Sequence, residues 1–235
     1  MSRSHSPRIV TNGMVLCLDA ANVKSYPGSG TTWTDLSGNG KNGTVTNATF
    51  NSGNGGYFTF DRTGDYVTVP NFTINAFTIC GFVKLNGIGK LQGIFGQAST
   101  IWAQLSMVLR ISADNKLNLG LSATGTSTNP YSEITSTMTF TSGTWYHIAA
   151  SFSKPNRKLY VNGSEVASTV TYGLTDFNYD LFASSSNIII GGYAFGSGLS
   201  YLLDGNISSI QLYNRVLTEE EIKQNFNATR GRFGV

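Results

Sequence analysis

Charged side chains are scarce in this sequence, and their scarcity limits the partners that the protein can bind. Asp, Glu, Lys and Arg together make up 12% of the 235 residues, against about 25% in an average soluble protein. The net charge of +3 is small and dispersed along the chain. Composition therefore does not indicate a nucleic-acid-binding protein.

Cysteine and histidine are also rare, which argues against a zinc site. The two cysteines, Cys17 and Cys80, do not form a CxxC pair, and His5 lies far from His147 in the sequence. No zinc-type ligand spacing is present. Each cysteine lies in an apolar, strand-like run. The pair permits one disulfide, but we expect two buried free thiols that behave as small hydrophobic residues.

Long apolar runs are missing as well. No run approaches the roughly 18 residues that a membrane-spanning helix needs, and residues 1–8 lack the apolar core of a signal peptide. We therefore expect no membrane segment and no export signal. Gly, Ser, Thr and Asn instead dominate the composition, as in many extracellular and virion β-proteins.

The most informative stretch is residues 144–166, TWYHIAASFSKPNRKLYVNGSEV. In its first half, alternate residues point to opposite sides, which is the period of a β-strand with two different faces. One side carries Tyr146, Ile148, Ala150 and Phe152, and the other carries Trp145, His147, Ala149 and Ser151. A turn at 154–157 leads to a return strand at 158–161. Asn162-Gly163 then predicts a type I′ hairpin, because both central residues of that turn need positive φ. The stretch is expected to form a β-meander.

Short strands separated by Gly, Asn and Asp turns are predicted along the rest of the chain. The expected strands are 14–19, 44–49, 56–61, 65–69, 77–85, 92–97, 104–111, 116–121, 133–140, 187–191 and 205–213. The run 77–85 is almost continuously apolar and predicts a central strand buried on both faces. We expect loops at 20–42, 122–131 and 192–200, and irregular structure at 171–186. Residues 1–12 read as a flexible arm, and 13–235 as one domain.

One helix is predicted near the end of the chain. Thr218 at the N-cap and Glu221 three residues later form a capping box, with Leu217 and Ile222 as a hydrophobic staple. Ile222 and Phe226 give the helix an apolar stripe. Two helical turns are not stable alone in water, so the helix must pack against the sheets.

Four motifs together resemble a known family. They are WYHIA followed by LYVNGxxV, WTDLSGNG at 33–40, FDRTGDYV at 60–67, and the stretch from DGNI at 204–207 to LTEEEI at 217–222. In order and spacing they resemble laminin-G-like, concanavalin A-like lectin/glucanase jelly-roll domains, of the type found in tailed-phage structural proteins. The resemblance implies an all-β fold, a two-sheet antiparallel jelly-roll sandwich with one short C-terminal helix. Because the family is functionally diverse, the fold alone does not assign a function.

The residues that would carry catalysis are not found. Glucanase relatives have catalytic carboxylates in an E-x-D-x-x-E pattern, which this sequence lacks, and Glu133 and Glu165 have no acidic partner two or four residues away. No serine lies in a G-x-S-x-G motif, and we expect His147 to be structural. The protein is therefore expected not to be an enzyme, and a glycoside hydrolase is the least favoured reading.

The resemblance also implies two kinds of binding site. Several relatives bind calcium with loop oxygens, and the candidate ligands here are Asp35, Asn39, Asp61 and Asp65. Asp and Asn also simply favour turns, and no other cofactor is expected. Carbohydrate binding needs an aromatic platform beside hydrogen-bonding groups. The candidates are Trp102, Tyr193, Phe195 and Tyr201, although some loop aromatics will instead fill the core.

We expect a non-enzymatic virion structural protein, a capsid decoration or tail-associated subunit. It would be assembled in the host cytoplasm and display a lectin-like domain at the particle surface. The expected partners are other capsid or tail proteins, with cell-surface glycans as further ligands and neither nucleic acid nor membrane; a homo-oligomer is allowed. Attachment is expected through the two ends of the chain, at Arg3, Arg8, Arg230, Arg232 and Phe233. The alternative is a free-standing carbohydrate-binding module or adhesin.

Overall fold

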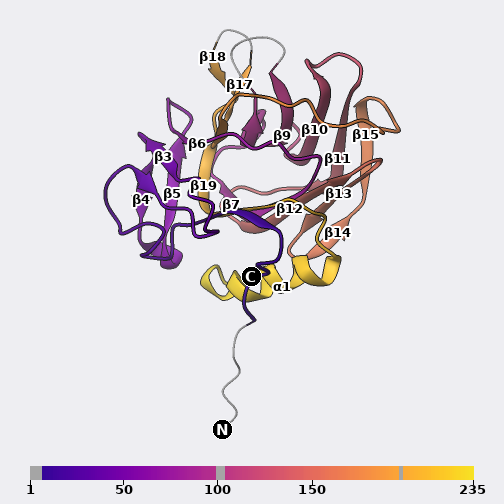
Figure 1. Ribbon diagram of the computed structural model, residues 1–235. Coiled ribbons are helices and arrows are strands. Elements are labelled where there is room, and N and C mark those ends of the chain that lie inside the picture. Colours follow the sequence, from indigo (N-terminus) through magenta and orange to yellow (C-terminus); the bar gives the residue numbers. More distant parts are fainter. Residues whose placement is uncertain (1–6, 99–103, 196–197) are drawn as a thin grey trace.

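The structure is a computed structural model that describes residues 7–98, 104–195 and 198–235. Within these residues, two antiparallel β-sheets lie one above the other and a single α-helix packs outside them (Figure 1). This arrangement confirms the predicted all-β sandwich with a short C-terminal helix. None of the helices in the described part of the chain is long and apolar enough to cross a membrane.

The eight-stranded sheet has the order β14-β13-β12-β7-β19-β5-β4, with β1 also paired to β19. Its strands are β1 (Met14–Asp19), β4 (Thr49–Asn51), β5 (Tyr57–Asp61), β7 (Ala76–Leu85), β12 (Trp145–Ser153), β13 (Asn156–Val161), β14 (Ser164–Val166) and β19 (Asp204–Tyr213). The expected meander is therefore β12, β13 and β14, in adjacent antiparallel positions.

The nine-stranded sheet has the order β15-β11-β10-β9-β8-β16-β6-β3-β2. Its strands are β2 (Thr32–Trp33), β3 (Gly43–Thr46), β6 (Tyr66–Val69), β8 (Gln92–Gln97), β9 (Leu105–Ile111), β10 (Lys116–Gly125), β11 (Tyr131–Thr139), β15 (Ser168–Gly173) and β16 (Ile188–Ile190). A separate hairpin of β17 (Tyr193–Phe195) and β18 (Gly198–Ser200) lies above this sheet, on the side away from the helix (Figure 1).

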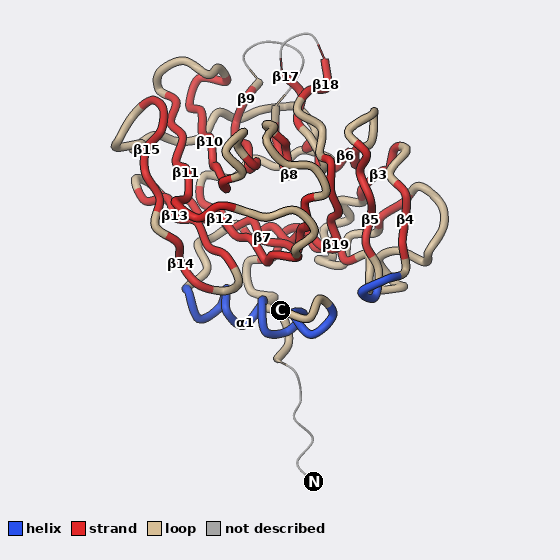
Figure 2. The backbone as a smooth tube through the Cα atoms, turned by 180° about the vertical axis from the view of Figure 1, so that it is seen from behind, coloured by secondary structure: helices blue, strands red, loops and turns tan. Residues whose placement is uncertain are grey.

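The main core fills the space between the two sheets. On β12, Tyr146, Ile148 and Phe152 point into it, as the alternation predicted. The opposite face of β12 is buried too, because the helix and the end of the chain cover that side of the eight-stranded sheet (Figure 2). The sequence predicted two different faces for β12, and in the structure both faces are buried, as they are in β7 beside it.

Helix α1 (Glu219–Thr229) begins with the predicted capping box between Thr218 and Glu221. Ile222 and Phe226 are buried against the sheet, as the apolar stripe predicted. A short 3₁₀ segment, η2 (Arg230–Arg232), follows the helix directly. Another 3₁₀ segment, η1 (Gly53–Gly55), precedes β5.

The described part of the predicted flexible arm is packed against the sandwich, which corrects the expected boundary at residue 12. Val10 is buried, and its N–H donates to Asn225 Oδ1 at 2.8 Å. Its carbonyl accepts from the Tyr213 hydroxyl at 2.9 Å. Gln224 Nε2 donates to the Arg8 carbonyl at 2.6 Å. Polar groups of the helix and β19 thus hold the segment from Arg8 onward.

Four segments that were expected to be loops or irregular contain strand residues. β2 lies within 20–42, the hairpin of β17 and β18 lies within 192–200, β15 extends into 171–173, and the ends of β10 and β11 enter 122–131. These segments are rich in Gly, Ser and Thr and show no clear apolar alternation. Their strand structure comes from pairing with a neighbour, a tertiary contribution that outweighs local propensity.

The two cysteines are free and buried, which confirms the expectation for them. Cys17 and Cys80 both pair with Gln211 of β19, one from each side. Two inter-strand steps of about 4.8 Å therefore separate them, which exceeds the reach of a disulfide. Burial raises the pKa of each thiol to about 12.

Gly163→Val should lower the free energy of unfolding by about 1–3 kcal/mol. Asn162 and Gly163 have φ of 50° and 82°, the conformation predicted for the hairpin between β13 and β14. A β-branched residue is strained at positive φ, and a Cβ at this position would lie 3.0 Å from Phe226 Cδ1. Chemical denaturation measures the effect, with Ser164→Val, at an exposed neighbouring position, as the control. Equal midpoints for Gly163→Val and the parent would contradict this turn.

Candidate functional site

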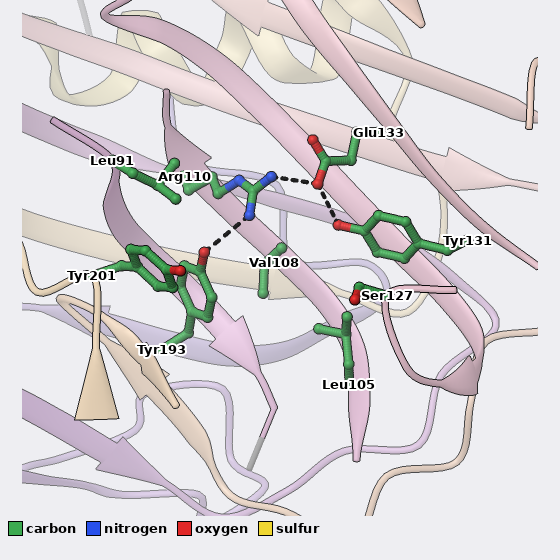
Figure 3. A pocket seen from close by; sticks show the side chains of 9 residues that line it. All are labelled: Leu91, Leu105, Val108, Arg110, Ser127, Tyr131, Glu133, Tyr193 and Tyr201. Atoms are coloured by element: carbon green, nitrogen blue, oxygen red, sulfur yellow. Dashed lines mark hydrogen bonds and ion pairs between the residues drawn. The ribbon is translucent and has the colours of Figure 1, made fainter. Parts of the chain in front are cut away.

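A pocket of about 90 Å³ lies on the outer face of the nine-stranded sheet, the face turned away from the core (Figure 3). It is lined by Leu91, Leu105, Val108, Arg110, Ser127, Tyr131, Glu133, Tyr193 and Tyr201. We call it the tyrosine pocket. Drug-sized ligands occupy pockets of about 300–1,000 Å³, so this pocket contacts only part of a larger ligand.

Strand alternation supplies the floor and one wall of this pocket. Leu109 and Ile134 point into the core from β9 and β11. Their neighbours Val108, Arg110 and Glu133 therefore point to the outer face. Each of these strands carries one charged residue, Arg110 in the largely apolar β9 and Glu133 in β11, which is rich in Ser and Thr.

Two glycines let aromatic rings lie close to the sheet. A Cβ at Gly96 of β8 would lie 2.4 Å from Tyr193 Cβ, and a Cβ at Gly120 of β10 would lie 2.6 Å from the Tyr131 hydroxyl oxygen. Any larger residue at either position would displace the ring. The tyrosine pocket thus depends on these two glycines.

Arg110 is the centre of a hydrogen-bonded network that joins the two sides of the pocket (Figure 3). Its Nε donates to Asn118 Oδ1 at 2.8 Å, and its Nη1 donates to the Tyr193 hydroxyl at 2.9 Å. Its Nη2 forms an ion pair with Glu133 Oε1. The Tyr131 hydroxyl donates to the same carboxylate oxygen at 2.5 Å.

Burial keeps the two tyrosines neutral, and the acidic groups around Arg110 keep the arginine protonated. Burial lowers the pKa of Arg110, but the oxygens of Tyr193, Tyr131 and Glu133 outweigh it and raise that pKa above its ordinary value. Burial raises the pKa of Tyr131, and the Glu133 carboxylate adds to the effect. Burial also raises the pKa of Tyr193 to about 12. Both hydroxyl groups are therefore protonated near neutral pH.

Tyr193 and Tyr201 form a stacked pair, with ring centroids 4.9 Å apart and planes 24° from parallel. Tyr193 is only 2% exposed, whereas Tyr201 is 36% exposed. The N–H of Gly93 in β8 donates to the Tyr201 carbonyl at 2.6 Å and so fixes this residue to the sheet. Tyr193 therefore supports the stack, and Tyr201 presents the accessible ring.

The structure brings together two of the four predicted carbohydrate-binding residues, Tyr193 and Tyr201. Phe195 is the last residue of β17, and Trp102 lies outside the described residues. Sequence reasoning missed Arg110, Glu133 and Tyr131 as site residues. For Arg110 the available signal was a charged residue between apolar neighbours in a predicted strand, since a charge there must be paired.

The four predicted calcium ligands lie in two separate turns, where the three aspartates accept hydrogen bonds from backbone N–H groups and Asn39 donates through its amide. The Asp35 carboxylate accepts from the N–H groups of Cys17 and Ser37 at 2.9 Å each and of Lys41 at 3.1 Å. Asn39 Nδ2 donates to Ser37 Oγ at 2.9 Å.

The second turn holds Asp61 and Asp65. The Asp61 N–H donates to Asp65 Oδ2 at 2.9 Å, and the Thr63 N–H donates to Asp61 Oδ1 at 2.6 Å. Burial raises the pKa of Asp65. In the described ranges, no three His, Cys, Asp or Glu residues gather as a metal site would require. Calcium binding stays a prediction.

The predicted attachment residues at the end of the chain are partly engaged by the sandwich itself. Phe233 is 8% exposed, and its ring stacks on Phe82 with centroids 4.2 Å apart. Arg232 Nη1 forms an ion pair with Asp19 at 2.8 Å. The Phe233 ring is therefore covered by its own sheet, because burying it there is more favourable than exposing it to water, and attachment to a particle through this residue stays a prediction. Arg8 and Arg230 are exposed, and Arg3 lies outside the described residues.

A sandwich of two antiparallel sheets, with a small helix packed outside one of them, has the architecture of a jelly roll. The chain belongs to the concanavalin A-like lectin/glucanases superfamily, since the Laminin_G_3 family model matches residues 60–223. No match was found among curated proteins.

Several solved structures share the fold. The binding domain of Paraclostridial Mosquitocidal Protein 1 superposes with a TM-score of 0.68 at 18% identity, over 93% of this chain and 52% of that one. Domain 4 of AbnA, a GH43 extracellular arabinanase from Geobacillus stearothermophilus in complex with arabinotriose, gives 0.66 at 16% identity, over 90% and 97%. Trypanosoma rangeli sialidase gives 0.63 at 19% identity, over 95% and 35%. The chain thus spans about half of the first of these structures and about a third of the sialidase.

Proposed function

We propose that this protein is a non-enzymatic carbohydrate-binding domain whose ligand occupies the tyrosine pocket. The observation that supports this proposal is the stacked pair of Tyr193 and Tyr201 beside the ion pair of Arg110 and Glu133. An exposed aromatic ring can stack on the apolar face of a sugar. A guanidinium and a carboxylate at its edge can hydrogen-bond to sugar hydroxyls as donor and acceptor.

The network retains hydrogen-bonding capacity for a ligand. A guanidinium has five N–H donors, and the described partners of Arg110 use three of them, through Asn118, Tyr193 and Glu133. Glu133 Oε2 accepts only from Asn118 Nδ2, at 3.3 Å, among the described residues. Two N–H donors and further lone pairs of the carboxylate thus remain for sugar hydroxyls.

The fold neighbours support binding as the general role. One is the binding domain of a mosquitocidal protein, and another is an arabinanase domain in complex with arabinotriose. The arabinanase domain matches over nearly its whole length, so this fold is known as a separate unit in a structure that contains a sugar.

The composition of the pocket supports binding without hydrolysis. Most glycoside hydrolases need two carboxyl groups on opposite sides of the scissile bond. Glu133 is the only carboxylate among the described residues that line the tyrosine pocket, and it forms an ion pair with Arg110.

Tyr201→Ala should reduce glycan affinity by about 5- to 140-fold while leaving the melting temperature unchanged. The loss is expected because stacking on this ring would supply about 1–3 kcal/mol by analogy with other planar ligands. The ring is partly exposed, so its removal opens no core cavity. A glycan array followed by calorimetry measures affinity. Tyr179→Ala, which also removes a half-exposed tyrosine but lies outside the tyrosine pocket, is the control. Unchanged affinity for Tyr201→Ala would exclude this ring as the platform.

We further propose the surface of a virus particle as the setting in which this domain acts. The sparse charge of the sequence and the resemblance of its motifs to tailed-phage structural proteins support this setting. Arg8 and Arg230 are the described attachment candidates that remain exposed. Quantitative mass spectrometry of purified particles tests the proposal through a stoichiometric copy number. Absence from particles would favour the free-standing carbohydrate-binding module.

A further inference from the structure

A second pocket of about 230 Å³ borders the tyrosine pocket on the same outer face. It is lined by Arg110, Ser112, Asp114, Asn118, Glu133, Thr135 and Thr171, and we call it the threonine pocket. Both pockets share Arg110 and Glu133. The ion pair is therefore a common wall between them, and a ligand that contacts it from one pocket can continue into the other.

Polar side chains continue across the sheet from this shared wall. Arg110 Nε donates to Asn118 Oδ1 at 2.8 Å, and Asn118 Nδ2 donates to Thr135 Oγ1 at 2.7 Å. The hydroxyls of Thr135 and Thr171 are 2.8 Å apart. The row crosses β9, β10, β11 and β15, three steps of about 4.8 Å, or roughly 14 Å in total. It is longer than one sugar ring and runs across the strands.

An irregular register in β15 adds to this surface. Glu133 pairs with Tyr172, and the next residue, Ile134, pairs with Val170, so Thr171 is an extra residue between them. A β-bulge of this kind can turn two successive side chains to one face. Thr171 accordingly contacts Thr135, and the Tyr172 ring, 56% exposed, lies 5.8 Å from the Tyr131 ring on the same face.

The fixed charges along the row balance one another. Arg110 is paired with Glu133, and at the turn between β9 and β10 Lys116 Nζ lies 3.9 Å from Asp114 Oδ2. No excess of positive charge is available along the described row for an acidic or sulfated glycan, and the Glu133 and Asp114 carboxylates would repel one. The surface fits a neutral ligand.

We propose that the ligand is a linear, neutral oligosaccharide that lies across β9, β10, β11 and β15. One sugar unit stacks on Tyr201 in the tyrosine pocket, and a later unit hydrogen-bonds to Thr171 in the threonine pocket. Arg110 and Glu133 contact the chain between them. This inference rests on the function proposed above and specifies that the protein recognises an internal segment of a glycan, beyond a single terminal sugar.

Calorimetry with the full chain tests this inference. The probes are arabino-, xylo-, cello- and malto-oligosaccharides of one to six units, with a heparin-derived hexasaccharide as the charged comparison. For the series that binds, affinity should rise at least tenfold between one and three units and then level off. Thr171→Val should weaken binding of three units or more about fivefold, the value of one hydrogen bond, and leave binding of one unit unchanged. Thr169→Val, on the same strand but outside both pockets, should have no effect.

Three results would overturn the inference. Affinity that does not depend on length, together with a silent Thr171→Val, would refute the extended ligand. If Tyr201→Ala still abolished binding in that case, the proposed function would stand. Tighter binding of the heparin hexasaccharide than of any neutral probe would refute the neutral class. Failure of every probe to bind would contradict the proposed function and this inference together.

Discussion

Arg110→Met should lower the free energy of unfolding by about 3–5 kcal/mol and abolish glycan binding. The side chains of Arg110 and Glu133 are only 14% and 16% exposed. Removing the guanidinium leaves the carboxylate mostly buried without its counter-charge, and it deprives the Tyr193 hydroxyl of a partner. Denaturant unfolding and calorimetry with a bound oligosaccharide measure the two effects.

A double variant separates the structural role of Arg110 from its role in binding. Arg110→Met combined with Glu133→Gln removes both charges and keeps an acceptor for the Tyr131 hydroxyl. Stability should return to within about 1–2 kcal/mol of the parent, whereas glycan binding should remain absent. If Arg110→Met alone left the stability unchanged, the pair would behave as an ordinary exposed salt bridge. If the double variant bound glycan normally, the ion pair would have no part in recognition.

Acid should destabilise the protein through His147. This side chain is fully buried on the outer face of β12, with its ring 5.1 Å from that of Phe82 and 5.8 Å from that of Phe226. Burial lowers its pKa from the ordinary 6.5 to about 3. The unfolded chain therefore takes up a proton at higher pH than the folded chain. The contribution of His147 to stability is complete above pH 6.5 and is lost as the pH falls toward about 3.

The expected slope is about 1.4 kcal/mol per pH unit between those values, or on the order of 4–5 kcal/mol in all. Denaturant unfolding between pH 3.5 and 8, for the parent and for His147→Leu, measures it. The difference between the two proteins cancels other titrating groups, such as Asp65, whose raised pKa acts in the opposite direction. Parallel pH profiles for the two proteins would show that His147 does not titrate on unfolding.

The elements that the sequence predicts best are those with local chemical signals. The Thr218–Glu221 capping box and the Asn162-Gly163 turn occur as expected, because each depends on residues within four positions of one another. The burial of His147 could not be predicted from local signals. Alternation assigns it to the second face of β12, but only the packing of α1 and the chain end covers that face.

The candidate site shows the same limit. Tyr193 and Tyr201 stood out as aromatics in a glycine-rich segment, and they do stack. Arg110 and Glu133 are 23 positions apart and meet only because β10 lies between β9 and β11 in a particular register. Phe233 was expected to be an external anchor. In the structure it stacks on Phe82, whose ring is placed to receive it only once the sheet has formed.

The central claim is that a glycan lies on the outer face of the nine-stranded sheet, and a structure of the complex tests it most directly. Crystals or NMR samples of the full chain with a neutral oligosaccharide that binds in calorimetry would locate the ligand. We predict contacts or amide shifts at Tyr201, Arg110, Glu133 and Thr171. A sugar located instead at the turns of Asp35 and Asp61, with these four residues unperturbed, would contradict the account.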